Sequence, residues 1–194
     1  MPRTESMTSH KPRVLVLLAD GAEEMEVVIT VDVLRRAGVE VVVAGLDGTN
    51  AVTCSRGVRL LPDAALATTD TTKQPFDVVV LPGGGEGSRR LASDPRVGAL
   101  LKSQEAAQRT IAAICAAPSA LAAHGVGAGR SLTSHPGVEA EVAAHGRYRT
   151  DAVVVDGPFV TSRGPGTAFE FALAIAARLV GREAAQALRA PMML

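Results

Sequence analysis

The chain has 194 residues, of which 47% are hydrophobic and only 3% aromatic, so it is long enough to bury an aliphatic core. Its 20 basic and 20 acidic residues cancel, which argues against sequence-specific nucleic-acid binding because such surfaces usually carry a basic excess. Two cysteines without zinc-site spacing argue against a disulfide scaffold or zinc finger, and no apolar stretch is long enough to cross a bilayer. We therefore expect a cytoplasmic protein without metal or membrane contact, with a disordered polar extension over 1–11 and a single domain over 12–194.

The first apolar segments predict a β-α-β unit. Arg13–Ala19 and Val39–Gly45 are continuous apolar runs, typical of strands that are buried on both faces of a parallel sheet. Between them, residues 20–38 carry apolar residues at helical spacing. Asp20 and Glu23 are expected to form a capping pair at the start of this helix.

The middle of the chain predicts the edge of the sheet and its third long strand. Asn50–Leu61 alternates weakly around Gly57, which is typical of a short antiparallel pair at a sheet edge. Thr68–Pro75 is polar and predicts a loop. Phe76–Gly87 begins as a buried strand and runs into glycines.

The second half of the chain continues the alternation. We expect, in chain order, a helix over 95–108, a strand over 110–114, a helix over 116–124, a strand over 131–134, a helix over 137–144, a strand over 152–156, and a strand from 159 followed by a long helix. This alternation predicts a doubly wound α/β sheet. Ligands bind such sheets beyond the carboxyl ends of the strands, where the stretches DGAEEME, LPGGGEG, ICAAP, TSHPG and TSRGPGT fall.

Cys115 lies at the turn between the strand over 110–114 and the following helix. A side chain at such an elbow is lifted out of the sheet, and the amides at the start of the helix, from Ala116 onward, can stabilise a thiolate or an oxyanion. These amides are expected to lower the pKa of the thiol. The alternative is a small buried apolar residue, as most free cysteines are.

Glu26 is the second candidate, because it lies beside the apolar face of the first helix. A carboxyl that is desolvated there has a raised pKa and can remain a proton donor next to the Cys115 thiolate. The alternative is a surface acid. Glu23 and Glu24 lie in the first helical turn, where the helix dipole stabilises negative charge, so we expect both to be solvated carboxylates.

His135 is the obvious partner for a Cys-His hydrolase, but no acid follows it to orient its ring. LPGGGEG is neither a GxGxxG fingerprint nor a Walker loop, so a nucleotide cofactor is unsupported. Its glycines can bring backbone N–H groups to Cys115, or simply form a turn. Arg36, Arg56 and Arg163 can bind a substrate anion or be ordinary solvated or interface residues.

Four stretches carry a family resemblance: KPRVLVLLADGAEEMEVVITVDVLRRAGVEVVVAGL, DVVVLPGGGEG, IAAICAAPSALAAHG and TSRGPGTAFEFALAIA. Together they resemble the Parkinsonism-associated DJ-type deglycases of the ThiJ/PfpI superfamily, from Arg13 to the end of the chain. The resemblance implies a flavodoxin-like sheet sandwiched by helices, as in class I glutamine amidotransferases. It also implies a homodimer and, in a eukaryote, nuclear and mitochondrial pools besides the cytoplasmic one.

The resemblance implies roles for five residues of this chain. It matches Cys115 to the family's nucleophile and Glu26 to the acid that hydrogen-bonds the nucleophile. It matches His135 to a nearby histidine that is not held in a proper triad. The oxyanion donors correspond to Gly84 and Ala116.

The same resemblance matches Arg56 to a site arginine and Arg36 to an arginine on the dimer side. The chain departs from the family at two positions. Ala117 stands where glycine is usual, which is expected to narrow the mouth of the pocket. Leu61 replaces a second peripheral cysteine.

The activity implied is a cofactor-independent glyoxalase III, which converts methylglyoxal to lactate, or a deglycase acting on early glycation adducts of proteins and nucleotides. Its partners would be small 2-oxoaldehydes and glycated amines. A redox-sensing chaperone with an oxidation-sensitive Cys115 is the alternative from another class. A cysteine peptidase or glutaminase-type amidotransferase, which shares the elbow, is a third reading.

Overall fold

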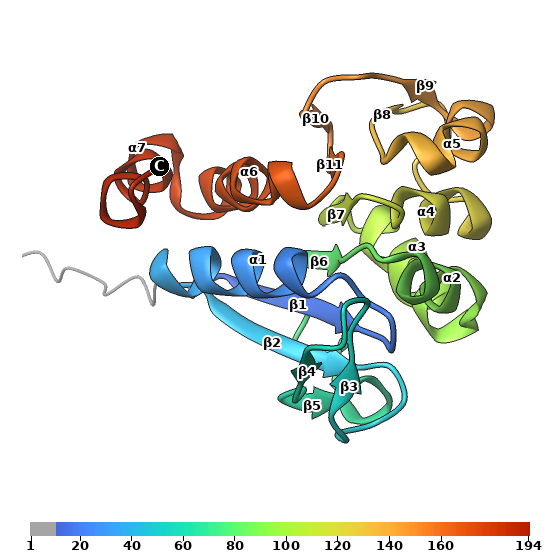
Figure 1. Ribbon diagram of the computed structural model, residues 1–194, viewed down its shortest axis with the longest axis horizontal. Coiled ribbons are helices and arrows are strands. Elements are labelled where there is room, and N and C mark those ends of the chain that lie inside the picture. The colour runs from blue at the N-terminus through green and yellow to red at the C-terminus, as the bar shows by residue number, and fades with distance from the viewer. Residues whose placement is uncertain (1–10) are drawn as a thin grey trace, which may run out of the picture.

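A computed structural model describes residues 11–194 and contains a central seven-stranded sheet with the strand order β10-β11-β7-β6-β1-β2-β5 (Figure 1). The strands of this sheet are β1 (Arg13–Leu18), β2 (Glu40–Gly45), β5 (Ala64–Ala65), β6 (Val78–Leu81), β7 (Thr110–Ile114), β10 (Val153–Asp156) and β11 (Phe159–Ser162). Neighbouring strands are parallel except for the antiparallel β10–β11 pair. The predicted mostly parallel α/β sheet is confirmed.

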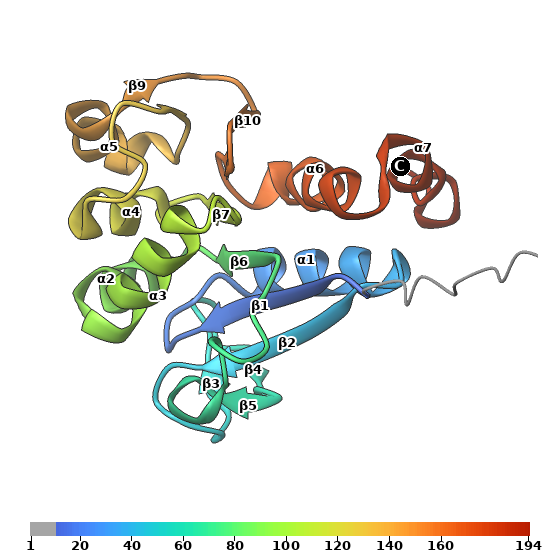
Figure 2. The ribbon, with the colours of Figure 1, turned by 180° about the vertical axis from the view of Figure 1, so that it is seen from behind.

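Helices cover both faces of the sheet (Figures 1 and 2). One face carries α1 (Glu24–Arg36), α6 (Ala168–Val180) and α7 (Arg182–Ala187). The other carries α2 (Gly85–Ser93), α3 (Pro95–Ala106), α4 (Pro118–His124) and α5 (Glu139–His145). Single 3-10 turns occur at η1 (Leu66–Thr68), η2 (Pro136–Val138), η3 (Pro165–Thr167) and η4 (Ala190–Met192). Within residues 11–194, no helix is both long and apolar enough to span a bilayer.

Two cores form on the two faces of the sheet. In β1, Val14 and Val16 point into the core beneath α1 and α6, whereas Leu15 and Leu17 point into the core beneath α2 to α5. All four side chains are at most 1% exposed. Because both faces are covered, both sets of alternating side chains are apolar, which explains the unbroken apolar runs of the sequence.

The start of α1 differs from its prediction. The carboxylate of Asp20 accepts a hydrogen bond from the Thr53 amide at 2.9 Å instead of capping the helix. Gly21 has φ 77°, which places it outside helical geometry. Glu23 is the actual N-cap and accepts from the Met25 amide at 3.3 Å. The predicted capping pair is therefore wrong, and the helix begins three residues later than expected, with Glu23 rather than Asp20 as its N-cap.

Three other predictions need correction. The expected edge pair exists as β3 (Val52–Thr53) and β4 (Arg59–Leu60), but it forms a separate antiparallel sheet, and β5 provides the edge instead. The strand expected over 131–134 is β8 (Ser131–Leu132), which pairs with β9 (Arg147–Tyr148) outside the central sheet. Helix α2 was missed because its glycine-rich start suggests a loop. The expected N-terminal extension lies, apart from Lys11, outside the described residues.

Candidate active site

Cys115 follows β7 directly, and its amide donates to the Ser162 carbonyl of the neighbouring strand β11 at 2.9 Å. Its φ of 63° lies in the left-handed region, which costs a residue with a side chain about 1 kcal/mol. The turn therefore holds a half-buried thiol beyond the carboxyl ends of the central strands. A backbone conformation of this cost is typical of functional sites.

Glu26 lies in the first turns of α1, and its side chain is only 1% exposed. Its Oε2 accepts a hydrogen bond from the Gly83 amide at 2.7 Å, whereas Oε1 has no partner within hydrogen-bonding geometry. The alternative of a solvated surface acid is therefore wrong. A buried carboxyl that also interacts with the Cys115 thiol is suited to exchanging a proton with it.

Gly83 lies against both candidates. A β-carbon placed on Gly83 would lie 2.5 Å from Cβ of Cys115 and 2.7 Å from Oε2 of Glu26. Only glycine fits in this space, so the loop after β6 can pack against the cysteine and the carboxyl, whose side chains also interact directly. Sequence reasoning marked the glycine run but not this residue, because the contact joins three elements that are far apart in the chain.

Burial raises the pKa of Glu26 from 4.5 to about 7. Burial and the facing charge of Glu26 also raise the pKa of the Cys115 thiol to about 12, although the amides of Gly84 and Ala116 act in the opposite direction. The expectation that these amides give a lowered thiol pKa is therefore wrong, because desolvation outweighs them. The two groups titrate as a pair that loses its first proton near pH 7.

A single negative charge shared by Cys115 and Glu26 is enough to form a thiolate nucleophile. When the remaining proton sits on Glu26, the sulfur is a thiolate that faces a neutral acid and the amides of Gly84 and Ala116. Gly84 has φ 87°, and a β-carbon on it would lie 2.2 Å from the Gly21 carbonyl oxygen, so only glycine holds this amide in place. The arrangement can therefore create a nucleophile by transferring a proton to Glu26, and it can stabilise an oxyanion.

Glu23 and Glu24 are not solvated acids, since they are only 8% and 7% exposed. The Ser55 hydroxyl lies 2.7 Å from Glu23 and 2.9 Å from Glu24, and the Arg56 amide donates to Glu24 at 2.9 Å. Although burial raises the pKa of Glu24, hydrogen bonds from backbone amides and Ser55 hold it below its ordinary value. These contacts fasten the β3–β4 hairpin to the start of α1, an interaction that local sequence patterns could not predict.

His135 is exposed, and its Nδ1 accepts from the Gly137 amide at 3.0 Å. Its own amide donates to the Cys115 carbonyl at 2.8 Å, so its backbone is tied to the elbow. Within residues 11–194, no carboxylate hydrogen-bonds the His135 ring, which is what a Cys-His hydrolase needs to orient its base. The geometry thus disfavours the peptidase and amidotransferase readings.

Neither Arg56 nor Arg36 hydrogen-bonds the Cys115 thiol within the described residues. Arg56 is exposed, and its guanidinium donates to the Ser55 carbonyl at 3.2 Å. Arg36 lies at the far end of α1, about 15 Å along the helix from Glu26. There it pairs with Asp32 at 2.7 Å.

Ala117 and Leu61, where the chain departs from the resembled family, differ in burial. Ala117 is completely buried and packs in the core beneath α4, so the expectation that it narrows the mouth of the pocket is wrong. Leu61 is 73% exposed. For the part of the chain that is described, no group of three or more His, Cys, Asp or Glu side chains is placed to hold a metal ion.

Comparison with known proteins now identifies the family. Residues 12–178 match the model of the DJ-1/PfpI family. The chain belongs to the DJ-1/PfpI family. It is 56% identical over 173 residues to protein dj-1beta of Drosophila melanogaster, covering 89% of this chain and 91% of that protein. It is 52% identical over 185 residues to the Parkinson disease protein 7 homolog of Danio rerio, covering 94% and 97%.

Two further DJ-1/PfpI comparisons bear on fold and activity. The crystal structure of Drosophila melanogaster DJ-1beta superposes with a TM-score of 0.92 at 52% identity, covering 95% of this chain and 99% of that one. A relative named glutathione-independent glyoxalase DJR-1.2, from Caenorhabditis elegans, is 42% identical over 189 residues, covering 97% and 99%. The resemblance seen in the sequence is confirmed.

Proposed function

We propose that this member of the DJ-1/PfpI family is a cofactor-independent glyoxalase III that converts methylglyoxal to lactate, and a deglycase that acts on early glycation adducts of amines. The observation that carries the proposal is the side-chain interaction of the Cys115 thiol with the buried Glu26 carboxyl, beside Gly83. The 42% identical relative that is named a glutathione-independent glyoxalase supports the choice of 2-oxoaldehydes as substrates.

In the proposed reaction, the Cys115 sulfur attacks the aldehyde carbon while Glu26 accepts the thiol proton. The amides of Gly84 and Ala116 bind the resulting oxyanion. Glu26 then moves a proton from the former aldehyde carbon to the neighbouring carbonyl carbon, which gives a thioester of the 2-hydroxy acid. Water hydrolyses the thioester, releases lactate and restores the thiol. With a glycated amine as substrate, the free amine leaves as well.

Measuring lactate formation from methylglyoxal tests this proposal. Cys115→Ser and Glu26→Gln should each abolish turnover while circular dichroism shows a retained fold. Cys54→Ala is the matched control, because Cys54 is 4% exposed and its pKa is raised to about 11 by burial and by the charges of Glu24, Glu23 and Asp20. Turnover that persists in Glu26→Gln would show that another base acts.

A redox-sensing and chaperone role is the second candidate. A Toxoplasma gondii DJ-1 structure described as oxidized, with a TM-score of 0.87 at 35% identity, favours it. Cys115 is half-buried and hydrogen-bonded to Glu26, whereas Cys54 is buried, so peroxide should add two oxygens to Cys115 alone. Intact mass and peptide mapping after mild peroxide give the readout. Oxidation spread over both cysteines, or oxidation without altered client binding, would count against this role.

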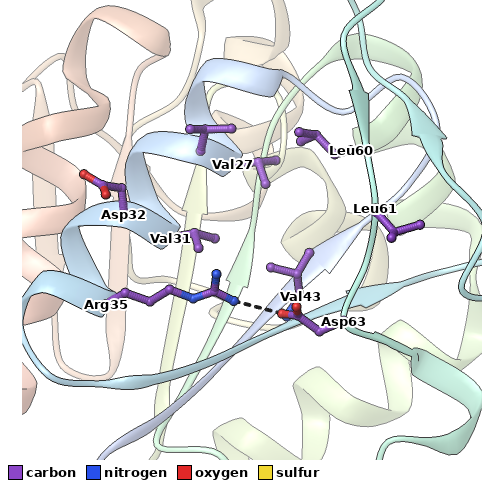
Figure 3. A pocket seen from close by; sticks show the side chains of 9 residues that line it. Val27, Val31, Asp32, Arg35, Val43, Leu60, Leu61 and Asp63 are labelled. Atoms are coloured by element: carbon purple, nitrogen blue, oxygen red, sulfur yellow. Dashed lines mark hydrogen bonds and ion pairs between the residues drawn. The ribbon is translucent and has the colours of Figure 1, made fainter.

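We further propose a homodimer that forms through α1 and the β3–β4 hairpin. A hollow of about 320 Å³ lies between α1, Val43 of β2 and the end of the hairpin at Leu60 and Leu61. Figure 3 shows the side chains that surround it. Its lining comprises Val27, Val28, Val31, Asp32, Arg35, Val43, Leu60, Leu61 and Asp63. Val28 is 49% exposed and Leu61 is 73% exposed at this surface, which also ends in an Arg35–Asp63 ion pair. Exposed apolar side chains that are grouped with charged ones are typical of an interface.

Sedimentation of the full chain tests the dimer. Leu61→Arg should yield monomers, whereas Val155→Arg, at a side chain that is 52% exposed on β10, should not. A dimer that survives Leu61→Arg would place the interface elsewhere. The free state of both cysteines also suits a reducing compartment, and we propose the cytoplasm, with nucleus and mitochondrion as further sites in a eukaryote.

A further inference from the structure

Arg163, the third arginine that the sequence offered as an anion-binding candidate, lies on a segment beside the cysteine. Arg163 follows β11, whose Ser162 pairs with Ile114 in register, so Arg163 stands opposite Cys115. The Cys115 amide bonds the Ser162 carbonyl at 2.9 Å, and a β-carbon on Gly164 would lie 4.0 Å from Sγ of Cys115. The segment that carries Arg163 is therefore in contact with the elbow.

This segment lines an open hollow of about 310 Å³. Its lining residues are Pro136, Arg163, Gly164, Pro165, Gly166 and Thr167. Pro136 adjoins His135, whose amide is bonded to the Cys115 carbonyl, and Gly164 approaches the sulfur from the other side. The hollow thus borders the thiol. Its volume is at the lower end of the range of small-molecule sites.

The charge of Arg163 has no counterpart in the described chain. The half-buried side chain donates from Nη1 to the Thr150 carbonyl at 3.2 Å, and its Nε is buried without an acceptor. By contrast, the nearby Arg149 pairs with Asp151 at 3.1 Å. Within residues 11–194, no carboxylate pairs with Arg163, and none of the residues that line the hollow is acidic. A guanidinium left without an anion in a hollow is a ready partner for a carboxylate.

We infer that the hollow beside Cys115 binds small carboxylates, with Arg163 as the counter-charge and the 2-hydroxy acid product as one such ligand. The inference deepens the proposed function and rests on it for the identity of the product. The reaction creates a carboxylate at the carbon that was bonded to the Cys115 sulfur, next to Gly164. Arg163 is therefore a binding residue for the carboxylate that the reaction creates.

Protection of Cys115 against alkylation tests this without requiring turnover. The full chain is alkylated with neutral iodoacetamide in the presence of lactate, of its neutral analogue lactamide, or of inorganic phosphate, and peptide mapping reports Cys115. Lactate should protect at about tenfold lower concentration than lactamide, the effect of one charge-assisted hydrogen-bonded contact. Arg163→Gln should abolish this preference, and Arg163→Lys should reduce it.

Arg149→Gln is the matched control and should keep the wild-type preference, because this arginine is paired with Asp151 and does not line the hollow. Equal protection by lactate and lactamide in the wild type would overturn the inference. So would a preference that survives Arg163→Gln, or protection by phosphate alone. If Arg163→Gln does not fold, an unchanged preference in Arg163→Lys overturns the inference instead. Lactate protection without methylglyoxal turnover would refute the proposed function and leave the carboxylate site standing.

Discussion

The two ends of helix α1 carry similar residues in opposite settings. At its start, Glu23, Glu24 and Glu26 are between 1% and 8% exposed, and backbone amides or the Ser55 hydroxyl bind them. At its end, the exposed Asp32 and Arg36 side chains face solvent and pair with each other at 2.7 Å. One helix therefore holds a reactive acid and an ordinary surface ion pair.

The difference teaches that burial, rather than the residue type, decides what a carboxyl can do. Burial raises the pKa of Glu26 to about 7, so this group can accept or release a proton at neutral pH. An exposed pair such as Asp32–Arg36 gains little, because water screens it. The contrast can be tested by making the same amide substitution at both ends of α1.

The largest effect is expected on the reactivity of Cys115. In the wild type, the alkylation rate should rise as the pH passes through about 7, because Glu26 then becomes able to accept the thiol proton. Glu26→Gln removes this acceptor together with the facing charge that raises the thiol pKa, so the rise in alkylation rate through pH about 7 should disappear and the rate should follow the thiol's own deprotonation at higher pH. Asp32→Asn should leave the rate unchanged. Iodoacetamide kinetics give the readout, and equal rates in the two variants would contradict the comparison.

The next effect concerns the free energy of unfolding: at neutral pH and above, removing the Glu26 carboxyl should stabilise the fold. The folded-state pKa of Glu26 is raised from 4.5 to about 7, so its contribution to stability is complete below pH 4.5 and is lost as the pH rises through about 7. Glutamine does not titrate. Glu26→Gln should therefore gain about 3 kcal/mol relative to the wild type between pH about 4 and pH about 8. Urea unfolding at both pH values measures the gain, and a constant difference between the proteins would contradict it.

A smaller effect is expected at Gly83, which lies against both groups. Gly83→Ala forces a methyl group against Cys115 and Glu26 and should destabilise the fold by about 2 kcal/mol while slowing alkylation. Gly85→Ala is the matched control, because a β-carbon there meets nothing within 4 Å. This control lies in the first turn of α2 and should be neutral or slightly stabilising. Similar losses in both variants would show that the pair tolerates a methyl group beside its members.

The smallest effect is expected at the exposed end of α1. Asp32→Asn should change the free energy of unfolding by less than about 0.5 kcal/mol, and the change should shrink further at high salt. Denaturant unfolding at low and high ionic strength measures it. A loss as large as that expected for Gly83→Ala would mean that exposure does not separate the two ends of the helix.

Much of the fold could be predicted because its signals are local. Arg13–Leu18 and Thr110–Ile114 are strands because their residues are almost continuously apolar. This pattern involves only residues that are adjacent in the sequence. The placement of Cys115 at the end of a strand followed from the same pattern, whereas the resemblance to the family rested on four specific stretches of sequence. The start of α1 was misplaced because the partner of Asp20, Thr53, lies 33 residues away.

The sequence by itself determined the mostly parallel α/β alternation apart from α2, the family, and the identity of Cys115 and Glu26 as the reactive candidates. Only the tertiary structure decided that Glu26 is buried, that Gly83 lies against both it and the cysteine, and that desolvation outweighs the helix amides at the sulfur. The physical reason is that periodicity acts over a few residues. Desolvation and close approach, by contrast, depend on elements that meet only when the sheet assembles.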